Sequence, residues 1–363
     1  MSILIFLIIL LVLVVSHEFG HFIVAKKSGI RVDEFSFGFP PKLFGFKKGE
    51  TSYNFNLLPL GGYVKIFGEN PDEDSINGSD KKRSMVHKSG WIQASVLIAG
   101  VVMNFLIAWI LLSIGFMSGL PASVGSVPEG AVVENQALTV ISTIKDSPAH
   151  MAGLKAGDKL TTLSTTTDMT EVVSPESVQY FVKRHAADTI TVSYMRGDMP
   201  ETVELVPKDL GDGVPVIGIS MDTIGVLKLP LGQALWEGLK LSSDVFIATV
   251  VGFYTLIHDA VTGHGSMAAL TGPVGIVGVV GEAAQFGFIY LLSFTAFISI
   301  NLAVINLIPF PALDGGRLLF LLIEKIKGSR IKPSVANMAN TIGFGILMLL
   351  MVFITYHDIV KLL

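Results

Sequence analysis

The sequence predicts a polytopic α-helical membrane protein with four transmembrane helices and two β-rich parts between them. Half of the 363 residues are hydrophobic and only 15% are charged, which is less polar than is usual for a soluble chain. The apolar residues gather in runs that approach or exceed the roughly 20 residues needed to cross a bilayer. Alternating aromatic residues and glycines, a pattern typical of strands and hairpins, mark the first β-rich part.

The composition also excludes several classes of protein. The net charge is −4, so the chain lacks the basic surface expected of a protein that binds nucleic acid. It contains no cysteine, which excludes disulfides, thiol catalysis and cysteine-based zinc sites. Any bound metal must therefore be held by histidine, aspartate or glutamate.

Four segments of the chain are expected to span the membrane. They are 1–34, 92–117, 286–316 and 342–363. A shorter apolar run, 245–257, lies in an amphipathic region, 223–285, that we expect on the membrane surface. The first segment lacks the basic start and small-residue cleavage site of a secretory signal. This favours a retained helix over a cleaved signal peptide.

Basic residues predict the orientation in the membrane. Lysine and arginine concentrate in the loop that includes 69–91 and in the loop 317–341, whereas 118–240 is mostly acidic. Because cytoplasmic loops carry the excess of lysine and arginine, both basic loops are expected in the cytoplasm. Both termini and the large middle segment would then be extracytoplasmic.

The first β-rich part is 35–68, which reads FSFGFPPKLFGFKKGETSYNFNLLPLGGYVKIFG. Its apolar content is high for a loop exposed to water. Two interpretations stay open at this point: a β-hairpin sheet that dips into the cytoplasmic leaflet, and an ordinary small β-domain on the surface.

The second β-rich part is 122–222, which we expect to be a separate soluble domain. Its stretch SPAHMAGLKAGD, a predicted helix over 175–185 and predicted strands over 189–195 and 202–207 resemble a PDZ domain. Such domains bind peptides by adding a strand to a sheet edge. The resemblance implies a peptide or protein segment as partner; the alternative is a β-rich domain of another kind.

The motif HEFGH lies inside the first span. His17 and His21 are one helical turn apart, and Glu18 follows the first histidine. On a helix this pattern supplies two zinc ligands and an adjacent general base. The alternative is two buried histidines beside a paired glutamate. That alternative is weak in lipid, where an uncompensated charge costs about 2.5–3.5 kcal/mol on insertion scales.

A catalytic zinc needs a third ligand and an open coordination position. The candidate is Asp314, in the stretch NLAVINLIPFPALDGG after the third span. The two prolines before Asp314 are expected to end the helix and extend the backbone, and the glycine pair after it to allow a tight turn. Asp314 could instead cap a helix that starts near Arg317, but the HEFGH motif favours ligation.

Together, these two motifs and the intervening PDZ-like domain resemble the site-2 protease family of intramembrane zinc metalloproteases, and most closely its regulator-of-sigma-E protease group. The resemblance covers nearly the whole chain. It implies one Zn²⁺ held by His17, His21 and Asp314, with Glu18 as the catalytic residue. It also implies a bacterial cytoplasmic (inner) membrane protein with its active site towards the cytoplasm. The implied substrates are single-pass membrane proteins within membrane lipid, such as anti-sigma factors, and remnant signal peptides.

The resemblance further implies residues that contact substrate. They are Asn301, Asn306, Pro309, Pro311 and, in a sheet that receives substrate as an added strand, Gly62, Tyr63 and Val64. Asn104 keeps its place in a family pattern of the second span, although Val101 replaces the usual proline. Its amide would stabilise an oxyanion or form a hydrogen bond between helices. The best-studied members of the group have two PDZ domains, and this chain has room for one.

Two other functions fit parts of the sequence. A metal transporter would use the same polar residues along a permeation path, but it would need internal repeats, which we do not find. A membrane scaffold with a structural zinc would need a fourth protein ligand, for which the sequence offers no obvious candidate.

Overall fold

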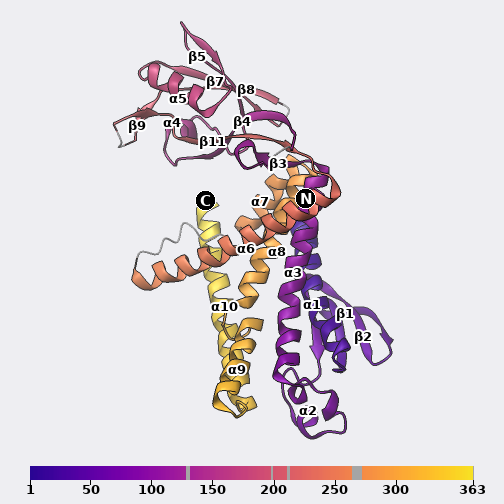
Figure 1. Ribbon diagram of the computed structural model, residues 1–363. Coiled ribbons are helices and arrows are strands. Elements are labelled where there is room, and N and C mark those ends of the chain that lie inside the picture. The colour runs from indigo at the N-terminus through magenta and orange to yellow at the C-terminus, as the bar shows by residue number, and fades with distance from the viewer. Residues whose placement is uncertain (128–130, 198, 211–212, 264–271, 363) are drawn as a thin grey trace. The chain divides into compact units, whose positions relative to one another are not determined.

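The computed structural model describes residues 1–127, 131–197, 199–210, 213–263 and 272–362. The chain divides into two compact units (Figure 1). The first, here called the membrane unit, comprises residues 1–114 and 232–363 and is mainly helical; the second, called the β-rich unit, comprises residues 115–231.

Five helices in the described residues are long and apolar enough to cross a membrane, one more than expected. They are α1 (Ser2–Lys27), α3 (Gly90–Ser118), α6 (Leu231–Thr262), α8 (Phe288–Leu307) and α10 (Pro333–Leu362). The additional helix is α6, whose 32 residues include the shorter run 245–257, which we did not count as a span. It runs obliquely to α3, α8 and α10 in Figure 1.

The third expected span and the region before it are divided differently from the prediction. The region 223–285 contains α6 and nearly all of α7 (Pro273–Phe286), with 264–271 outside the described residues. In α7, Val280 packs against Ile9 and Leu13 of α1, so this helix is part of the membrane unit's core. After α8 the chain forms an irregular segment and then a further helix, α9 (Asp314–Lys327).

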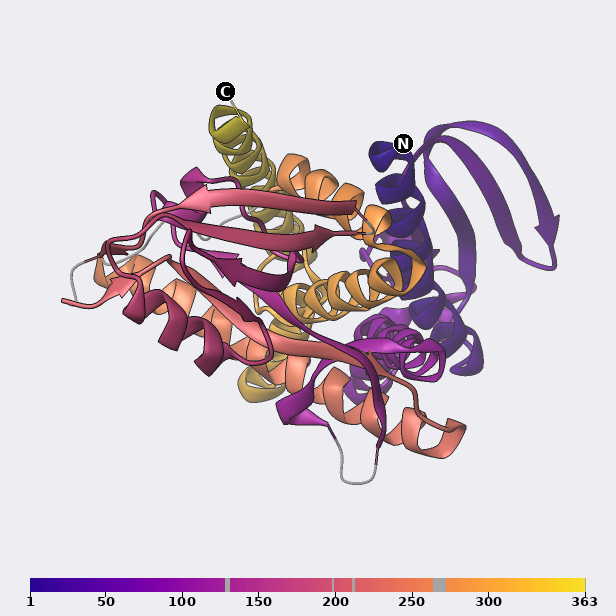
Figure 2. The same ribbon diagram turned by 90° about the horizontal axis from the view of Figure 1, so that it is seen from above.

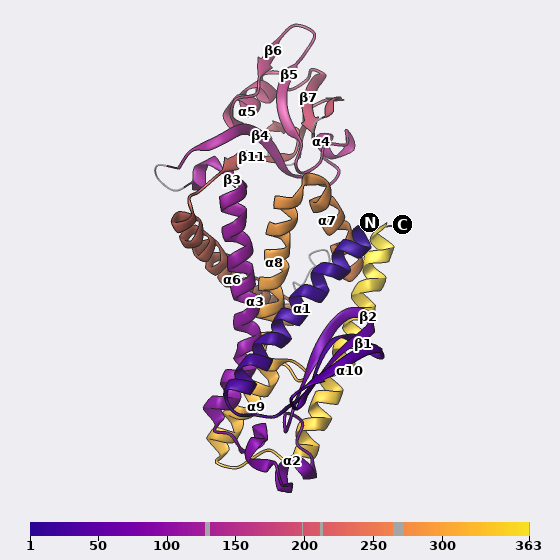
Figure 3. The same ribbon diagram turned by 90° about the vertical axis from the view of Figure 1, so that its right-hand side faces the viewer.

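The two basic loops lie at one end of the membrane unit. Figures 1 and 3 show α9 and the short helix α2 (Glu73–Asn77) at this end, and both chain termini at the other. Short 3-10 turns, η1 (Lys81–Arg83) and η2 (Met85–His87), complete the first loop. This arrangement agrees with the expectation that both loops share one side of the membrane.

The segment 35–68 forms most of an antiparallel sheet from β1 (Val32–Lys48) and β2 (Thr51–Ile66), beside α1 (Figure 2). Strand β2 bends back on itself, because two of its residues, Tyr53 and Val64, both pair with Phe35 of β1. Phe35 and Val64 also belong to a buried cluster with residues of α1 and α3. The far end exposes Leu43 and Phe44 by 61% and 60%. Such an apolar surface supports the interpretation of a sheet that dips into lipid.

The β-rich unit contains one mixed-length sheet with the strand order β3-β11-β4-β5-β7-β8, and β6 pairs with β5. Its strands are β3 (Leu120–Ser123), β4 (Val133–Thr143), β5 (Lys159–Ser164), β6 (Met169–Glu171), β7 (Ile190–Arg196), β8 (Met199–Leu205) and β11 (Ile219–Leu227); η3 (Val124–Ser126) follows β3, and β9 (Lys208–Asp209) pairs separately with β10 (Pro215–Val216).

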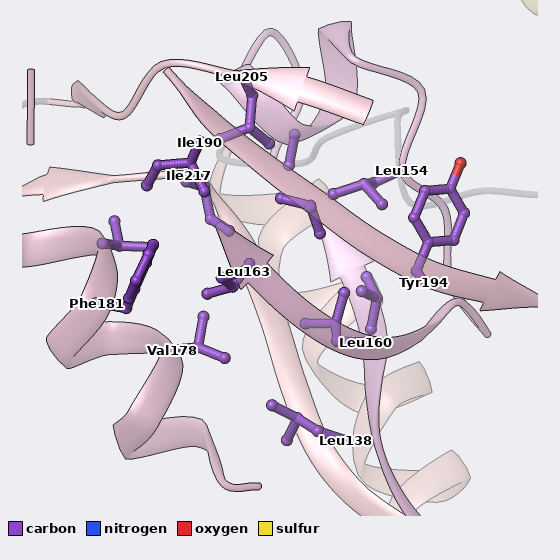
Figure 4. Packing of buried hydrophobic residues seen from close by; sticks show 14 residues of the cluster. Leu138, Leu154, Leu160, Leu163, Val178, Phe181, Ile190, Tyr194, Leu205 and Ile217 are labelled. Carbon is purple, nitrogen blue, oxygen red and sulfur yellow. The ribbon is translucent and has the colours of Figure 1, made fainter. Parts of the chain in front are cut away.

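The core of the β-rich unit lies between this sheet and helix α5 (Pro175–Arg184), with α4 (Pro148–Met151) nearby. Val178 and Phe181 of α5 point towards Leu163 of β5 (Figure 4). A capping box begins α5: Ser174 Oγ accepts a hydrogen bond from the Ser177 N–H, and Ser177 Oγ accepts one from the Ser174 N–H. The unit thus has its own core, and its assignment as a PDZ domain stays a prediction.

Candidate metal centre

The two histidines of HEFGH lie on the buried face of α1, against α3. His17 and His21 are only 7% and 6% exposed. Two glycines make this approach between the helices close. A Cβ atom added to Gly20 would lie 2.3 Å from the Ala99 carbonyl oxygen, and one added to Gly100 would lie 2.5 Å from His21 Nε2. Small residues therefore give α3 room beside the histidine pair.

Three potential ligand atoms converge at this point. Asp314 Oδ2 lies 3.1 Å from His17 Nε2 and 3.2 Å from His21 Nε2, and the two Nε2 atoms are 3.1 Å apart. Zinc bonds of 2.0–2.1 Å in a tetrahedron place ligand atoms about 3.3–3.4 Å from one another. The three side chains therefore fit one shared zinc ion with little movement. Within the described part of the chain, this is the one group found that could hold a metal.

A hydrogen bond orients the second histidine. His21 Nδ1 is 2.7 Å from the Val96 carbonyl oxygen, and a ring nitrogen must be the donor in such a contact. The lone pair of Nε2 is then free for a metal, as in most histidine ligands. His17 Nδ1 is buried and has no hydrogen-bond partner among the described residues.

Glu18 lies beside the sheet rather than between the ligands. Its carboxylate accepts a hydrogen bond of 2.9 Å from the Val64 backbone N–H, and the residue is half-buried. Val64 lies opposite Phe35 of β1. Because its N–H donates to Glu18 of α1, this N–H belongs to the edge of β2 that faces away from β1. The edge of β2 therefore borders the glutamate of the motif.

The segment around Asp314 differs from the prediction in two details. Asp314 is the first residue of α9, and Leu313 is the N-cap, so the alternative role of Asp314 as a helix cap is wrong. The glycine pair lies inside α9 and does not form a tight turn. A Cβ added to Gly315 would lie 2.3 Å from the Leu307 carbonyl oxygen, and one added to Gly316 would lie 2.2 Å from that of Phe310. These glycines let α9 fold back against the loop.

The residues predicted to contact substrate lie in different surroundings. The side chain of Asn301 donates to the Phe297 carbonyl oxygen of its own helix, at 2.8 Å. Asn306 and Pro311 are half-buried, and Pro309 is exposed. A Cβ at Gly62 would meet the Ser36 carbonyl oxygen at 2.6 Å, so this glycine is needed for close strand pairing.

Asn104 lies one helical turn beyond Gly100 and is fully buried. Its backbone carbonyl accepts a hydrogen bond of 2.8 Å from Ser299 Oγ of α8. Neither polar atom of its side chain has a partner in the described structure. The contact between these helices is therefore made by the backbone, and the side-chain amide stays available.

Sequence reasoning missed some contacts that support the site. The Val96 carbonyl carries no sequence signal, since any residue could supply it. Arg317 hydrogen-bonds Glu69 and, at 3.0 Å, Asn70, and so ties α9 to the segment after β2. Gly20 could have been noticed, because it is the small residue within HEFGH itself.

The comparisons with known proteins agree with this geometry. The model of Peptidase family M50 matches residues 5–350. The chain belongs to peptidase family M50. This confirms the resemblance to site-2 proteases. A protein of Clostridium acetobutylicum whose name places it among zinc metalloproteases is 35% identical over 351 residues, which are 96% of this chain and 94% of that protein.

Two further relatives carry more specific names. The regulator of sigma-W protease RasP of Bacillus subtilis is 28% identical, and zinc metalloprotease RasP of Bacillus licheniformis is 29% identical; both alignments cover 98% of each chain. With the apolar helices, these matches make this M50 protein an integral membrane zinc metalloprotease.

Proposed function

We propose that this M50 protease cleaves peptide bonds within the transmembrane segments of single-pass membrane proteins. His17, His21 and Asp314 hold its single Zn²⁺, and Glu18 is its general base. The observation that carries the proposal is the convergence of Nε2, Nε2 and Oδ2 at 3.1–3.2 Å beside a glutamate that lies outside the ligand group.

Bound zinc supplies a Lewis acid that polarises a peptide carbonyl and lowers the pKa of a coordinated water towards about 7. The carboxylate of Glu18 would take up a proton from the attacking water and return it to the leaving amine. The hydrogen bond from the Val64 N–H fixes the direction of this carboxylate. The bond from His21 to Val96 fixes the tautomer of that ligand.

The substrate segment has to unwind before it is cut, because a helix hides its amides in its own hydrogen bonds. The edge of β2 at Gly62, Tyr63 and Val64 would hold the unwound stretch as an added strand in lipid. The Val64 N–H donates to Glu18, so the remaining groups of this edge would pair with the substrate backbone. The contact between Val64 and Glu18 supports this assignment, since it brings the edge next to the base.

Further contacts with substrate are part of the same proposal. Asn104 donates its amide to the developing oxyanion, which its burial and lack of a side-chain partner among the described residues favour over a role between helices. Substrate also meets the residues before Asp314 along α8 and its following loop. These are Asn301, Asn306, Pro309 and Pro311.

The name of the Bacillus subtilis relative, regulator of sigma-W protease, suggests the substrate class. We extend the proposal to anti-sigma factors with one membrane span and to remnant signal peptides. The enzyme lies in a bacterial cytoplasmic membrane with its basic loops in the cytoplasm, and its termini and β-rich unit are extracytoplasmic.

The β-rich unit, as a PDZ domain, would bind an extended peptide along β11. Strand β3 pairs with β11 only from Ile224 to Leu227. The remaining residues of β11, from Ile219 to Thr223, have no strand neighbour on that side among the described strands, and α5 packs near them. A peptide strand fits at such an edge.

The proposed function is tested by Glu18→Gln in the full-length protein, reconstituted with a single-pass substrate. We expect the variant to retain zinc and to lose cleavage, because the amide cannot accept the proton. Ser16→Ala, a change one residue before the motif, is the matched control and should cleave normally. Cleavage by Glu18→Gln at the wild-type rate would remove Glu18 as the base.

A further inference from the structure

Helix α10 contacts the loop that precedes Asp314. The Ala312 N–H donates a hydrogen bond of 3.2 Å to Asn340 Oδ1 of α10. One helical turn later, Gly343 lies against Pro311: a Cβ added there would be 2.6 Å from the Pro311 carbonyl oxygen and 2.7 Å from Pro311 Cβ. Two residues of α10 thus contact two consecutive residues of the loop: Asn340 accepts a hydrogen bond from one, and Gly343, which has no side chain, packs against the other.

The conformation of this loop needs outside support. Ala312 has φ +76°, in the left-handed region that residues with a side chain rarely adopt. Such backbone persists only where its surroundings hold it. The prolines at 309 and 311 have no N–H to donate, so the bond from Ala312 to Asn340 is a main anchor of this stretch to another helix.

We propose that α10 positions the third zinc ligand. Asn340 fixes the left-handed turn at Ala312, and Gly343 gives Pro311 its place. Together they set the direction from which Asp314, two residues further on, reaches the two histidines. The inference rests on the proposed role of Asp314 as a ligand. Asn340 and Gly343 touch neither metal nor substrate in this account, so both are positioning residues.

The glycines of α10 provide a matched pair for the test. Gly343→Ala forces a Cβ against Pro311, whereas a Cβ at Gly345 meets no atom of the described residues within 4 Å. Both changes raise helix propensity by the same amount. In the purified full-length protein, zinc affinity is measured by competition with a chelator. Gly343→Ala should bind zinc about 10-fold more weakly, as is typical for partners behind a ligand. Gly345→Ala should bind like wild type.

A second set of variants tests the hydrogen bond. Asn340→Ala removes the acceptor and should also weaken zinc binding, whereas Asn340→Asp retains an acceptor oxygen and should restore it. Asn337→Ala, one turn earlier on α10, is the control. The unfolding temperature of each zinc-free variant is measured as well. If the residues only position the ligand, zinc affinity changes, while each zinc-free variant unfolds at the same temperature as its control.

Equal zinc affinity in Gly343→Ala and Gly345→Ala, together with wild-type affinity in Asn340→Ala, would overturn the role of α10. If Gly343→Ala does not fold, the Asn340 pair decides alone. Asp314→Asn is measured in the same assay. If it binds zinc like wild type, the assignment of Asp314 as a ligand fails. If Asp314→Asn binds zinc weakly but the α10 variants bind it like wild type, Asp314 remains a ligand that other contacts hold in place.

Discussion

Helices α1 and α9 supply ligands to the same site, but different contacts position these ligands. α1 presents His17 and His21 from a continuous helix, whose own hydrogen bonds fix their spacing at one turn. Asp314 follows an irregular loop, which is packed against the glycine pair of α9 and hydrogen-bonded to Asn340. The difference teaches that the spacing of the histidine pair is locally determined, whereas the position of the carboxylate depends on contacts from distant parts of the chain.

The largest effect is expected where this comparison is broken completely. Asp314→Asn removes the charged ligand but leaves the histidine pair of α1 intact. Zinc affinity should fall by more than about 100-fold, which is the upper range for partners that only orient a ligand. Elemental analysis of the purified protein measures the loss. Unchanged stoichiometry would remove Asp314 from the set of ligands.

The next effect tests whether α1 is as self-sufficient as its helix suggests. Gly100→Ala adds a Cβ within 2.5 Å of His21 Nε2, and the ring must move. We expect zinc to bind about 10–100-fold more weakly. Gly90→Ala is a change at the start of α3, the helix that contains Gly100. Its added Cβ has no atom within 4 Å in the part of the chain that the structure describes, and this variant should bind zinc normally. Equal affinity of the two variants would mean that α3 does not confine the histidines.

A smaller effect separates the base from the ligands. Val64→Pro removes the N–H that Glu18 accepts, and this N–H lies on the sheet edge, where proline is tolerated. Zinc content should stay unchanged, while kcat falls at least about ten-fold, a part of the 10²–10⁴-fold that a positioned base contributes. The measurement is cleavage of a reconstituted substrate. A kcat equal to that of wild type would show that Glu18 needs no support from β2.

The smallest effect concerns a histidine in the β-rich unit whose two ring nitrogens contact carboxylates. His185 Nδ1 bonds Asp188 at 2.8 Å and Nε2 bonds Asp168 at 3.2 Å. The Asp188 contact, and then Asp168, raise the pKa of His185 above its ordinary value. The imidazolium therefore stabilises the folded unit fully below about pH 6.5, and this contribution is lost as the pH rises through the raised pKa.

Hydrogen exchange at the end of α5 in the full-length protein measures this pH effect. Exchange should accelerate as the pH rises above about 6.5, beyond the intrinsic change, and His185→Gln should abolish the difference. Zinc affinity of His185→Gln should equal that of wild type, because both ring nitrogens of His185 are engaged by aspartates. Weaker zinc binding in this variant would contradict the separation between the two kinds of histidine.

The features that could be predicted from the sequence are those with a local pattern. HEFGH in an apolar run predicts two ligands on one helical face, and the aromatic alternation of 35–68 predicts strands. Asp314 was identified through its prolines and through the need for a third ligand. The contacts that hold it could not be predicted, because Asn340 and Gly343 are separated from it by a helix and a loop. Likewise the sequence does not show that the Asn104 amide lacks a partner among the described residues, because this depends on how α3 and α8 pack.

X-ray absorption at the zinc edge of the full-length protein tests most directly whether the histidine pair of α1 and Asp314 of α9 share one ion. The account predicts two imidazole ligands and one carboxylate oxygen at about 2.0–2.1 Å, with the remaining position filled by solvent. Asp314→Asn should lose the carboxylate and keep the imidazoles. A shell with four protein ligands, or one without two imidazoles, would contradict the account.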